Sequence, residues 1–146
     1  MCIRDRIMDY KKFGNKIVLR LKKGDKIIES IKEMVSKEDI KACHFAGIGA
    51  ANEIKLGLLH PGDSDYDWEI FSEDMEITSL VGNVTRFEGE PMVHAHITCG
   101  REDFSIIGGH LGEGTCSLTV ELFVDILDGE LIKKADSELK INTIEF

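Results

Sequence analysis

The chain has 146 residues, of which 42% are hydrophobic and 31% are charged, and its formal net charge is -9 at pH 7. This length accommodates one domain with a sizeable core but not two. The longest apolar run, SLTVELFVDIL, falls well short of the ~20 residues of a membrane-spanning helix, and the acidic charge disfavours direct binding to a phosphate backbone.

The first residues, MCIRDRIMDY, have no apolar segment followed by a cleavage site, so we expect no secretory signal. MCIRDR resembles translated sequencing adapter. We therefore expect residues 1–13 to be an extension, disordered or artefactual at 1–6, ahead of a single domain at 14–146. The four cysteines are scattered without a CxxC pair, which favours reduced thiols and a cytoplasmic location: Cys2, Cys43, Cys99 and Cys116.

Two elements are predicted in the first quarter of the chain. In NKIVLRLKKGD, Ile17, Leu19 and Leu21 share one face, which predicts a strand followed by a glycine turn. In DKIIESIKEMVSKEDI, the apolar residues recur at helical spacing, which predicts a helix whose first turn is capped by Asp25. We interpret the basic residues of 11–23 as a solvated strand and turn, not as a nucleic-acid surface.

From residue 41 onward the sequence changes to short runs separated by Gly, Pro, Asn or Asp. We interpret these runs as six or seven strands, mostly antiparallel, and predict an α+β fold with one main helix beside the sheet. The last segment, SELKINTIEF, is a further candidate strand. One helix cannot cover both faces of such a sheet, so we expect part of its surface to be buried between subunits.

The run MVHAHITC carries two histidines, His94 and His96. Residues two apart in a strand point to the same face, so the two imidazoles project together while Val93, Ala95 and Ile97 face the core. Two neutral imidazoles at a fixed separation suit one divalent metal ion, but two ligands are too few for tight zinc binding. The plainer interpretation is that the pair belongs to the polar face of a sheet.

A third ligand is available in FSIIGGHL. We expect this run to pair with MVHAHITC across the turn GRED and so bring His110 to the pair, with Gly108 and Gly109 leaving room for the approach. Three histidines with a free fourth position are typical of a water-bearing site. Glu121 is a candidate to orient one of the histidines or to act as a general base, against the plainer interpretation of a solvated or salt-bridged glutamate.

Other motifs carry weaker signals. We interpret His44 as a packed or surface residue and His60 as a turn residue. GIGAAN, at 47–52, has the composition of a strand end and lacks the third glycine of a dinucleotide-binding loop, so we expect no such cofactor. The acidic stretch PGDSDYDWEIFSED lacks the ligand spacing of a calcium loop and is interpreted as a solvated loop.

Three segments, AGIGAANEIKLGLL, LVGNVTRFEGEPMVHAHITC and FSIIGGHLGEGTCSLTVELFV, resemble the PPC domain, the plant and prokaryote conserved domain. The combination P-x-x-H-x-H followed by G-G-H-L is similar to the stand-alone prokaryotic form. The resemblance implies an α+β fold assembled as a homotrimer, and a metal site formed by His94, His96 and His110. It also implies association with DNA, but the chain has no R-G-R-P core of an AT-hook, so direct DNA binding rests on the family alone.

Two functions of different kinds are therefore open. The first is a homotrimeric binding or regulatory module with protein partners, which carries a divalent metal, with zinc preferred to copper, nickel or iron. The alternative is a metal-dependent, hydrolase-like enzyme in which zinc lowers the pKa of a bound water toward ~7 and makes a nucleophile for a small molecule. Such a reaction would also need a general base, for which Glu121 is the one candidate, and the sequence indicates no membrane partner.

Overall fold

The computed structural model describes residues 9–146, so the expectation of an artefactual segment at 1–6 lies outside the described residues. The described chain contains one helix and nine strands, which confirms a mostly antiparallel sheet with one main helix. Seven strands follow residue 41, where six or seven were expected, and the two that precede the helix bring the whole sheet to nine. The elements are β1 (Asp9–Phe13), β2 (Lys16–Lys22), α1 (Ile27–Lys37), β3 (Cys43–Leu58), β4 (Asp67–Phe71), β5 (Met75–Phe87), β6 (Glu90–Gly100), β7 (Ile106–Ile126), β8 (Ile132–Asp136) and β9 (Ile141–Glu145).

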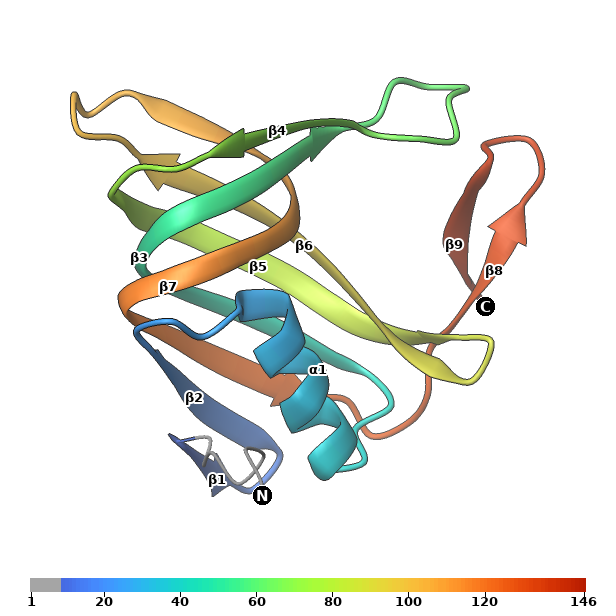
Figure 1. Cartoon of the computed structure of the whole chain (residues 1–146). Coiled ribbons are helices and arrows are strands. Elements are labelled where there is room, and N and C mark those ends of the chain that lie inside the picture. The colour runs from blue at the N-terminus through green and yellow to red at the C-terminus, as the bar shows by residue number, and fades with distance from the viewer. Residues whose placement is uncertain (1–8) are drawn as a thin grey trace, which may run out of the picture.

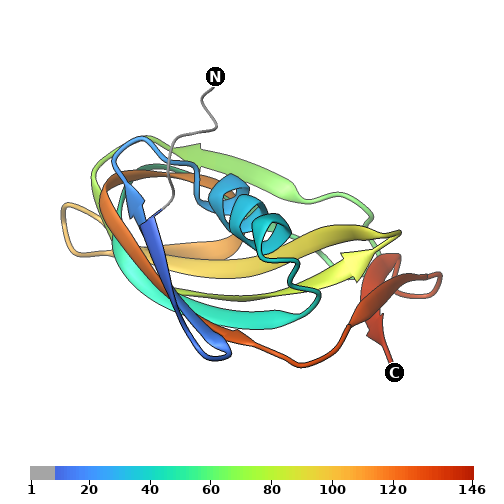
Figure 2. The ribbon, with the colours of Figure 1, turned by 90° about the horizontal axis from the view of Figure 1, so that it is seen from below.

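Four of the strands close on one another. β7 pairs with β3 and β6, and β5 also pairs with β3 and β6, so these strands form a closed ring of antiparallel pairings. β2 and β1 extend the sheet beyond β7, and β4 is added to β3. Figures 1 and 2 show the sheet strongly curved, with α1 packed against it at β6 and β7.

β3 and β7 are longer than the sequence predicts, at 16 and 21 residues. Each joins two runs that we expected to be separate strands, and GIGAAN therefore lies inside β3 and not at a strand end. Glycine is needed in this segment because the backbone of β7 lies too close for a side chain. A Cβ on Gly47 would lie 2.2 Å from the carbonyl oxygen of Glu121. Register shifts in the β3–β7 pairing let these long strands bend.

The expected extension at 1–13 contains an edge strand of the sheet. β1 pairs with β2 from Asp9↔Arg20 to Phe13↔Lys16, and Gly14, with φ 64°, lies in the turn between them. The basic residues here are exposed and partly neutralised, as a solvated strand and turn would be. Their ion pairs are Lys12–Glu38, Lys16–Asp125 and Arg20–Asp9.

The core lies between the inner face of the sheet and α1. Ile17, Leu19 and Leu21 are 0% exposed, which confirms the predicted alternation in β2. Cys43, Cys99 and Cys116 are buried free thiols, and burial raises the pKa of Cys43 and of Cys99 to about 11. Within residues 9–146, α1 is too short and too polar to cross a membrane.

A carboxylate from a distant strand caps the N-terminus of α1. The predicted cap, Asp25, is wrong: Lys26 is the N-cap residue, and the Asp25 carboxylate accepts the N–H of Lys22 instead. Glu113 of β7 accepts the N–H of Ile28 at 2.7 Å and that of Glu29 at 3.2 Å. β7 reaches the helix because Thr115 forms a bridge with Lys26.

Glu113→Ala is expected to lower the free energy of unfolding by about 1–2 kcal/mol, because it removes the acceptor of two helical N–H groups and a negative charge at the positive end of the helix dipole. Urea unfolding followed by circular dichroism measures the change. Glu102→Ala, at an exposed glutamate in the turn between β6 and β7, is the control and should change stability by less than about 0.5 kcal/mol. Equal effects of the two substitutions would contradict the capping role.

Candidate metal centre

Three histidines converge on the outer face of the ring of strands. His96 and His110 are direct cross-strand partners in the β6–β7 pairing, which confirms that FSIIGGHL pairs with MVHAHITC. His94 lies two residues before His96 on the same face of β6. Ala95 and Ile97, which alternate with them, are 1% and 2% exposed and belong to the core.

The three side chains are close enough to share one ion. One ligand nitrogen from each histidine lies within 4.8 Å of the other two. The ring centroids are 5.1 Å apart for His94 and His96, 5.5 Å for His94 and His110, and 5.8 Å for His96 and His110. Zn–N bonds of about 2.0–2.1 Å place the nitrogens of a tetrahedral site ~3.3 Å apart, so modest ring rotations complete the geometry.

Small residues let three strands meet at His110. Its partner on β3 is Gly57, and a Cβ on Gly109 would lie 2.9 Å from the Gly57 carbonyl oxygen. A Cβ on Gly108 would lie 2.7 Å from the carbonyl oxygen of Ile97. The predicted role of the GG pair, leaving room for a close approach, is therefore confirmed.

Two aromatic side chains that the sequence analysis missed pack around His110. Tyr66 stacks on its ring at a centroid distance of 4.3 Å and an angle of 24°, and the Trp68 ring lies 5.9 Å away. Gly57 makes room for both, because a Cβ there would lie 2.8 Å from each ring. The acidic stretch interpreted as a solvated loop thus includes β4, which lies in YDWEIFSED, one of the short runs also interpreted as a strand.

The environments of His94 and His110 favour the neutral form of their imidazoles. Burial lowers the pKa of His94 to about 4, and the charges of Lys133, His96 and His110 add to this shift. Burial likewise lowers the pKa of His110, assisted by His96 and Lys133. The buried Nδ1 of His110 has no hydrogen-bond partner among the described residues. Neutral rings and a free ring nitrogen are what metal ligation requires, so these residues fit a divalent ion.

The metal-free protein is expected to lose stability as the pH falls from about 6.5 to about 4. In this range the His94 imidazole is protonated in the unfolded chain but stays neutral in the folded chain, because its pKa in the folded chain lies below the ordinary value of 6.5. The loss attributable to His94 is at most about 3 kcal/mol. Urea unfolding in a chelator at pH 7 and pH 4.5 should show a smaller drop for His94→Gln than for the wild type or for His44→Gln; equal drops would contradict this assignment.

The other histidines and Glu121, which the sequence also offered as candidates, lie away from the three-histidine cluster. His44 is exposed on β3 opposite Asp125, and His60 Nε2 lies 3.1 Å from the Asp67 carboxylate. Glu121 is exposed farther along β7, opposite Arg20 and Ile48. The structure therefore does not bring Glu121 to the three histidines, and the cluster of possible ligands found in residues 9–146 contains no carboxylate.

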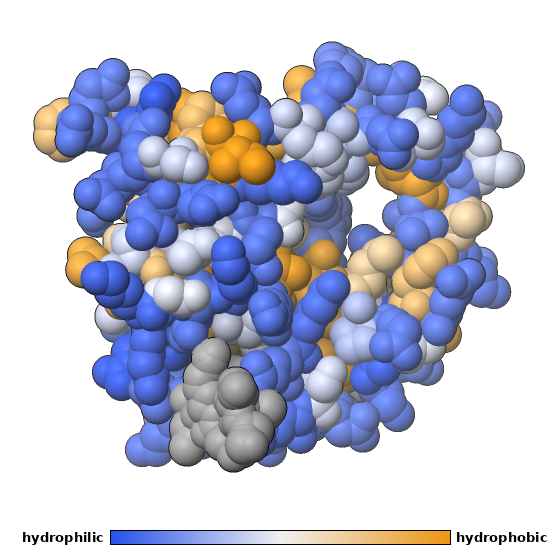
Figure 3. Space-filling model, in the orientation of Figure 1, coloured by the Kyte–Doolittle hydropathy of each residue, from blue (hydrophilic) through white to orange (hydrophobic). Residues whose placement is uncertain are grey.

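A pocket of about 390 Å³ opens beside His94 and His110. Tyr66 and Met92 line one side, and residues of the terminal hairpin, β8 and β9, line the other. Figure 3 shows the hollow between this hairpin, on the right, and the rest of the molecule. A three-histidine cluster that borders such a hollow has the arrangement of an open site, in which the fourth coordination position is available.

Fold and site together define a small, mostly β protein with a candidate metal centre on the outer face of its sheet. The Plants and Prokaryotes Conserved (PCC) domain matches residues 8–128, and the chain belongs to this family. The match begins one residue before β1 and confirms the resemblance to the PPC domain seen in the sequence. No curated protein matches the chain.

Several solved structures are similar over nearly the whole chain. A protein from Bacteroides thetaiotaomicron described as a candidate DNA-binding protein is 29% identical, with a TM-score of 0.92 over 95% of this chain and 97% of its own. A PPC protein from Pyrococcus horikoshii is 27% identical, with a TM-score of 0.83 over 96% and 95%. A metal-containing protein from Archaeoglobus fulgidus is 27% identical, with a TM-score of 0.85 over 96% and 99%.

Proposed function

We propose that this protein is a homotrimeric binding module in which His94, His96 and His110 hold one divalent metal ion, with zinc the preferred ion. The observation that carries the proposal is the meeting of three imidazole nitrogens within 4.8 Å. The metal-containing relative from Archaeoglobus fulgidus supports it. Residues 14–146, with β1 added as an edge strand, act as one domain in this proposal.

Metal content tests the site. Protein purified without an affinity tag should contain close to one zinc ion per chain by mass spectrometry, and the His94→Ala, His96→Ala double variant should contain background levels. The matched control is His44→Ala, His60→Ala, which removes two histidines outside the cluster and should retain the ion. A wild type that binds no zinc, copper, nickel or iron after exposure to each would contradict the proposal.

The trimer is supported by an apolar row across the outer face of the sheet. Val18, Phe123, Ala46 and Val81 are successive cross-strand partners on β2, β7, β3 and β5, and the row continues to His96. Phe123 is 63% exposed and Val81 43%. Ala46 between them and Val18 beside Phe123 are half-buried. A contiguous apolar row of this kind is typical of a surface that a protein partner covers, and another copy of the chain is the occupant that we propose.

Sedimentation equilibrium tests the assembly. The wild type should have three times the 16.3 kDa mass of the chain, and Phe123→Glu should have the mass of one chain, because it places a charge in the centre of the apolar row. Leu139→Glu changes an exposed leucine of the terminal hairpin and should leave the trimer intact. A monomeric wild type would contradict the assembly without affecting the metal proposal.

We propose that any association of this protein with DNA is mediated by a partner protein. The relative from Bacteroides thetaiotaomicron is described as a candidate DNA-binding protein, but this chain has a net charge of -9. Its basic cluster is also engaged in ion pairs with Asp9, Glu38 and Asp125. A mobility-shift assay at low salt is expected to show no complex, and a complex that weakens as salt rises would indicate direct binding.

A second candidate function is metal-dependent hydrolysis of a small molecule. The observation that favours it is the pocket beside His94 and His110. A bound zinc ion would supply a water of lowered pKa as the nucleophile. Glu121 lies elsewhere, so the structure assigns no general base to this reaction. If the site is catalytic, wild type and the control His44→Ala should hydrolyse an activated ester faster than His110→Ala at the same zinc concentration; equal rates for all three would exclude this function for that substrate.

A further inference from the structure

Lys133 is a lysine with a largely buried side chain close to His94 and His110. It lies on β8 and is 8% exposed, it has no ion pair or hydrogen bond within residues 9–146, and burial lowers the pKa of its ammonium group. Its neighbour Lys134 is exposed and pairs with Glu145 at 2.8 Å. The Lys133 Nζ is not among the buried, unpartnered polar atoms of residues 9–146, so the aliphatic stem is buried while the charged end reaches the solvent of a pocket.

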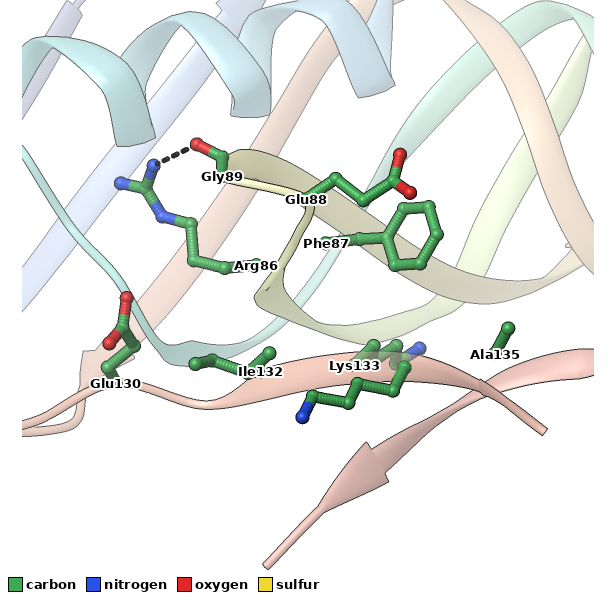
Figure 4. Close-up of a pocket in the computed structure, with 9 residues that line it drawn as sticks. Arg86, Phe87, Glu88, Gly89, Glu130, Ile132, Lys133 and Ala135 are labelled. Carbon is green, nitrogen blue, oxygen red and sulfur yellow. Dashed lines mark hydrogen bonds between the residues drawn. The ribbon is translucent and has the colours of Figure 1, made fainter.

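Lys133 lies between two hollows, and one of them is the pocket beside the histidines. In that pocket it shares the lining with His94 and His110, and its charge lowers the pKa of both. The other hollow lies at the turn from Arg86 to Gly89 (Figure 4). Glu88 and Glu130 border this second hollow, but within the described chain neither pairs with Lys133.

The pocket beside the histidines is rich in positive charge. Its lining includes Lys133 and Lys140 and, among the described residues, no carboxylate, although the chain as a whole carries a net charge of -9. A divalent ion on three neutral imidazoles would keep both of its positive charges. With Lys133 beside it, the occupied site would hold a concentration of positive charge that no lining side chain balances.

We propose that this pocket binds a small organic carboxylate, with one oxygen at the open position of the metal and the negative charge paired with Lys133. This rests on the metal site proposed above. Apolar side chains form part of the wall and favour a ligand with a short hydrocarbon portion: Leu59, Met92, Val93 and Ile141. A volume of about 390 Å³ fits a small molecule of this kind. In this proposal Lys133 determines the preference of the pocket for a negatively charged ligand.

A pair of ligands of equal shape tests the charge preference. In an NMR titration, zinc-loaded wild type should bind isobutyrate at least about tenfold more tightly than isobutyramide, its neutral counterpart. Lys133→Met removes the charge but keeps a long apolar stem, and should weaken isobutyrate binding by about tenfold while changing isobutyramide binding by less than about twofold. Lys134→Met, at the exposed neighbour, is the matched control and should leave both affinities unchanged.

Equal binding of the carboxylate and the amide by the zinc-loaded wild type would overturn the proposal, as would a folded Lys133→Met variant that keeps the preference. If Lys133→Met does not fold, Lys133→Gln provides the same comparison, and the wild-type comparison of the two ligands stands by itself. Zinc content is measured on the same samples. Full zinc content without a charge preference overturns only the carboxylate site, whereas a wild type that takes up no metal overturns the metal centre as well.

Discussion

His110→Ala is expected to lower the affinity for zinc by about two to three orders of magnitude. The reason is geometric: His110 is the ligand that β7 contributes opposite His96, and without it only the pair on β6 remains. Structural zinc sites with four ligands bind with about 10–16 kcal/mol, so one ligand accounts for several kcal/mol. Competition with a fluorescent zinc chelator at pH 7 measures the dissociation constant.

The substitution should leave the fold intact, because the buried Nδ1 of His110 makes no hydrogen bond with the described residues and its loss breaks none there. His44→Ala is the matched control, since His44 is exposed on the same sheet outside the cluster. It should bind zinc as the wild type does. If His110→Ala retained wild-type affinity, the ion would be held by His94 and His96 with other groups, and the three-histidine site would be wrong.

Gly82→Ala is expected to lower the free energy of unfolding by about 3 kcal/mol or more. Gly82 on β5 faces Ala95 on β6, and a Cβ there would lie 2.4 Å from the carbonyl oxygen of His94 and 2.6 Å from the Phe45 ring. The carbonyl belongs to the backbone and Phe45 is 0% exposed, so neither can move aside without disturbing the packing. Because the substitution also displaces the strand that carries His94, zinc affinity should fall in parallel.

Thermal unfolding in the presence of a chelator measures the stability change separately from metal binding. At about 2–4 °C per kcal/mol for a domain of this size, the melting temperature should fall by about 6–12 °C. Gly100→Ala, on β6, is the control, because a Cβ there would meet its nearest neighbours at 3.8 Å and should change stability by less than about 0.5 kcal/mol. A Gly82→Ala variant as stable as wild type would show that β5 and β6 can separate at this point.

Features that depend on neighbouring residues were predictable from the sequence. Alternation in β2 and helical spacing in α1 are local patterns, and the structure confirms both. The meeting of His94, His96 and His110 was also predictable, because strand geometry fixes the first pair and a short turn brings back the next strand.

Features that depend on distant packing were not predictable. Glycines in GIGAAN resemble a strand end, but they mark where β3 lies against the β7 backbone. The capping of α1 by Glu113 joins residues 85 positions apart. Tyr66 and Lys133 come to the histidines only through the arrangement of the loop before β4 and of the terminal hairpin. Periodicity within one segment contains no information about such contacts.

The terminal hairpin of β8 and β9 is attached differently from the strands of the ring. Its pairing with β5 consists of Arg86 and Ile132, next to a hydrogen bond from the Arg86 N–H to the Leu131 carbonyl, whereas each ring strand pairs with a neighbour on both sides. Proteins open in cooperative units of unequal stability, so this hairpin can detach and return while the ring stays folded. Since the hairpin carries Lys133, exchange of a ligand at the histidine pocket can be gated by local opening of the chain's last element, without global unfolding.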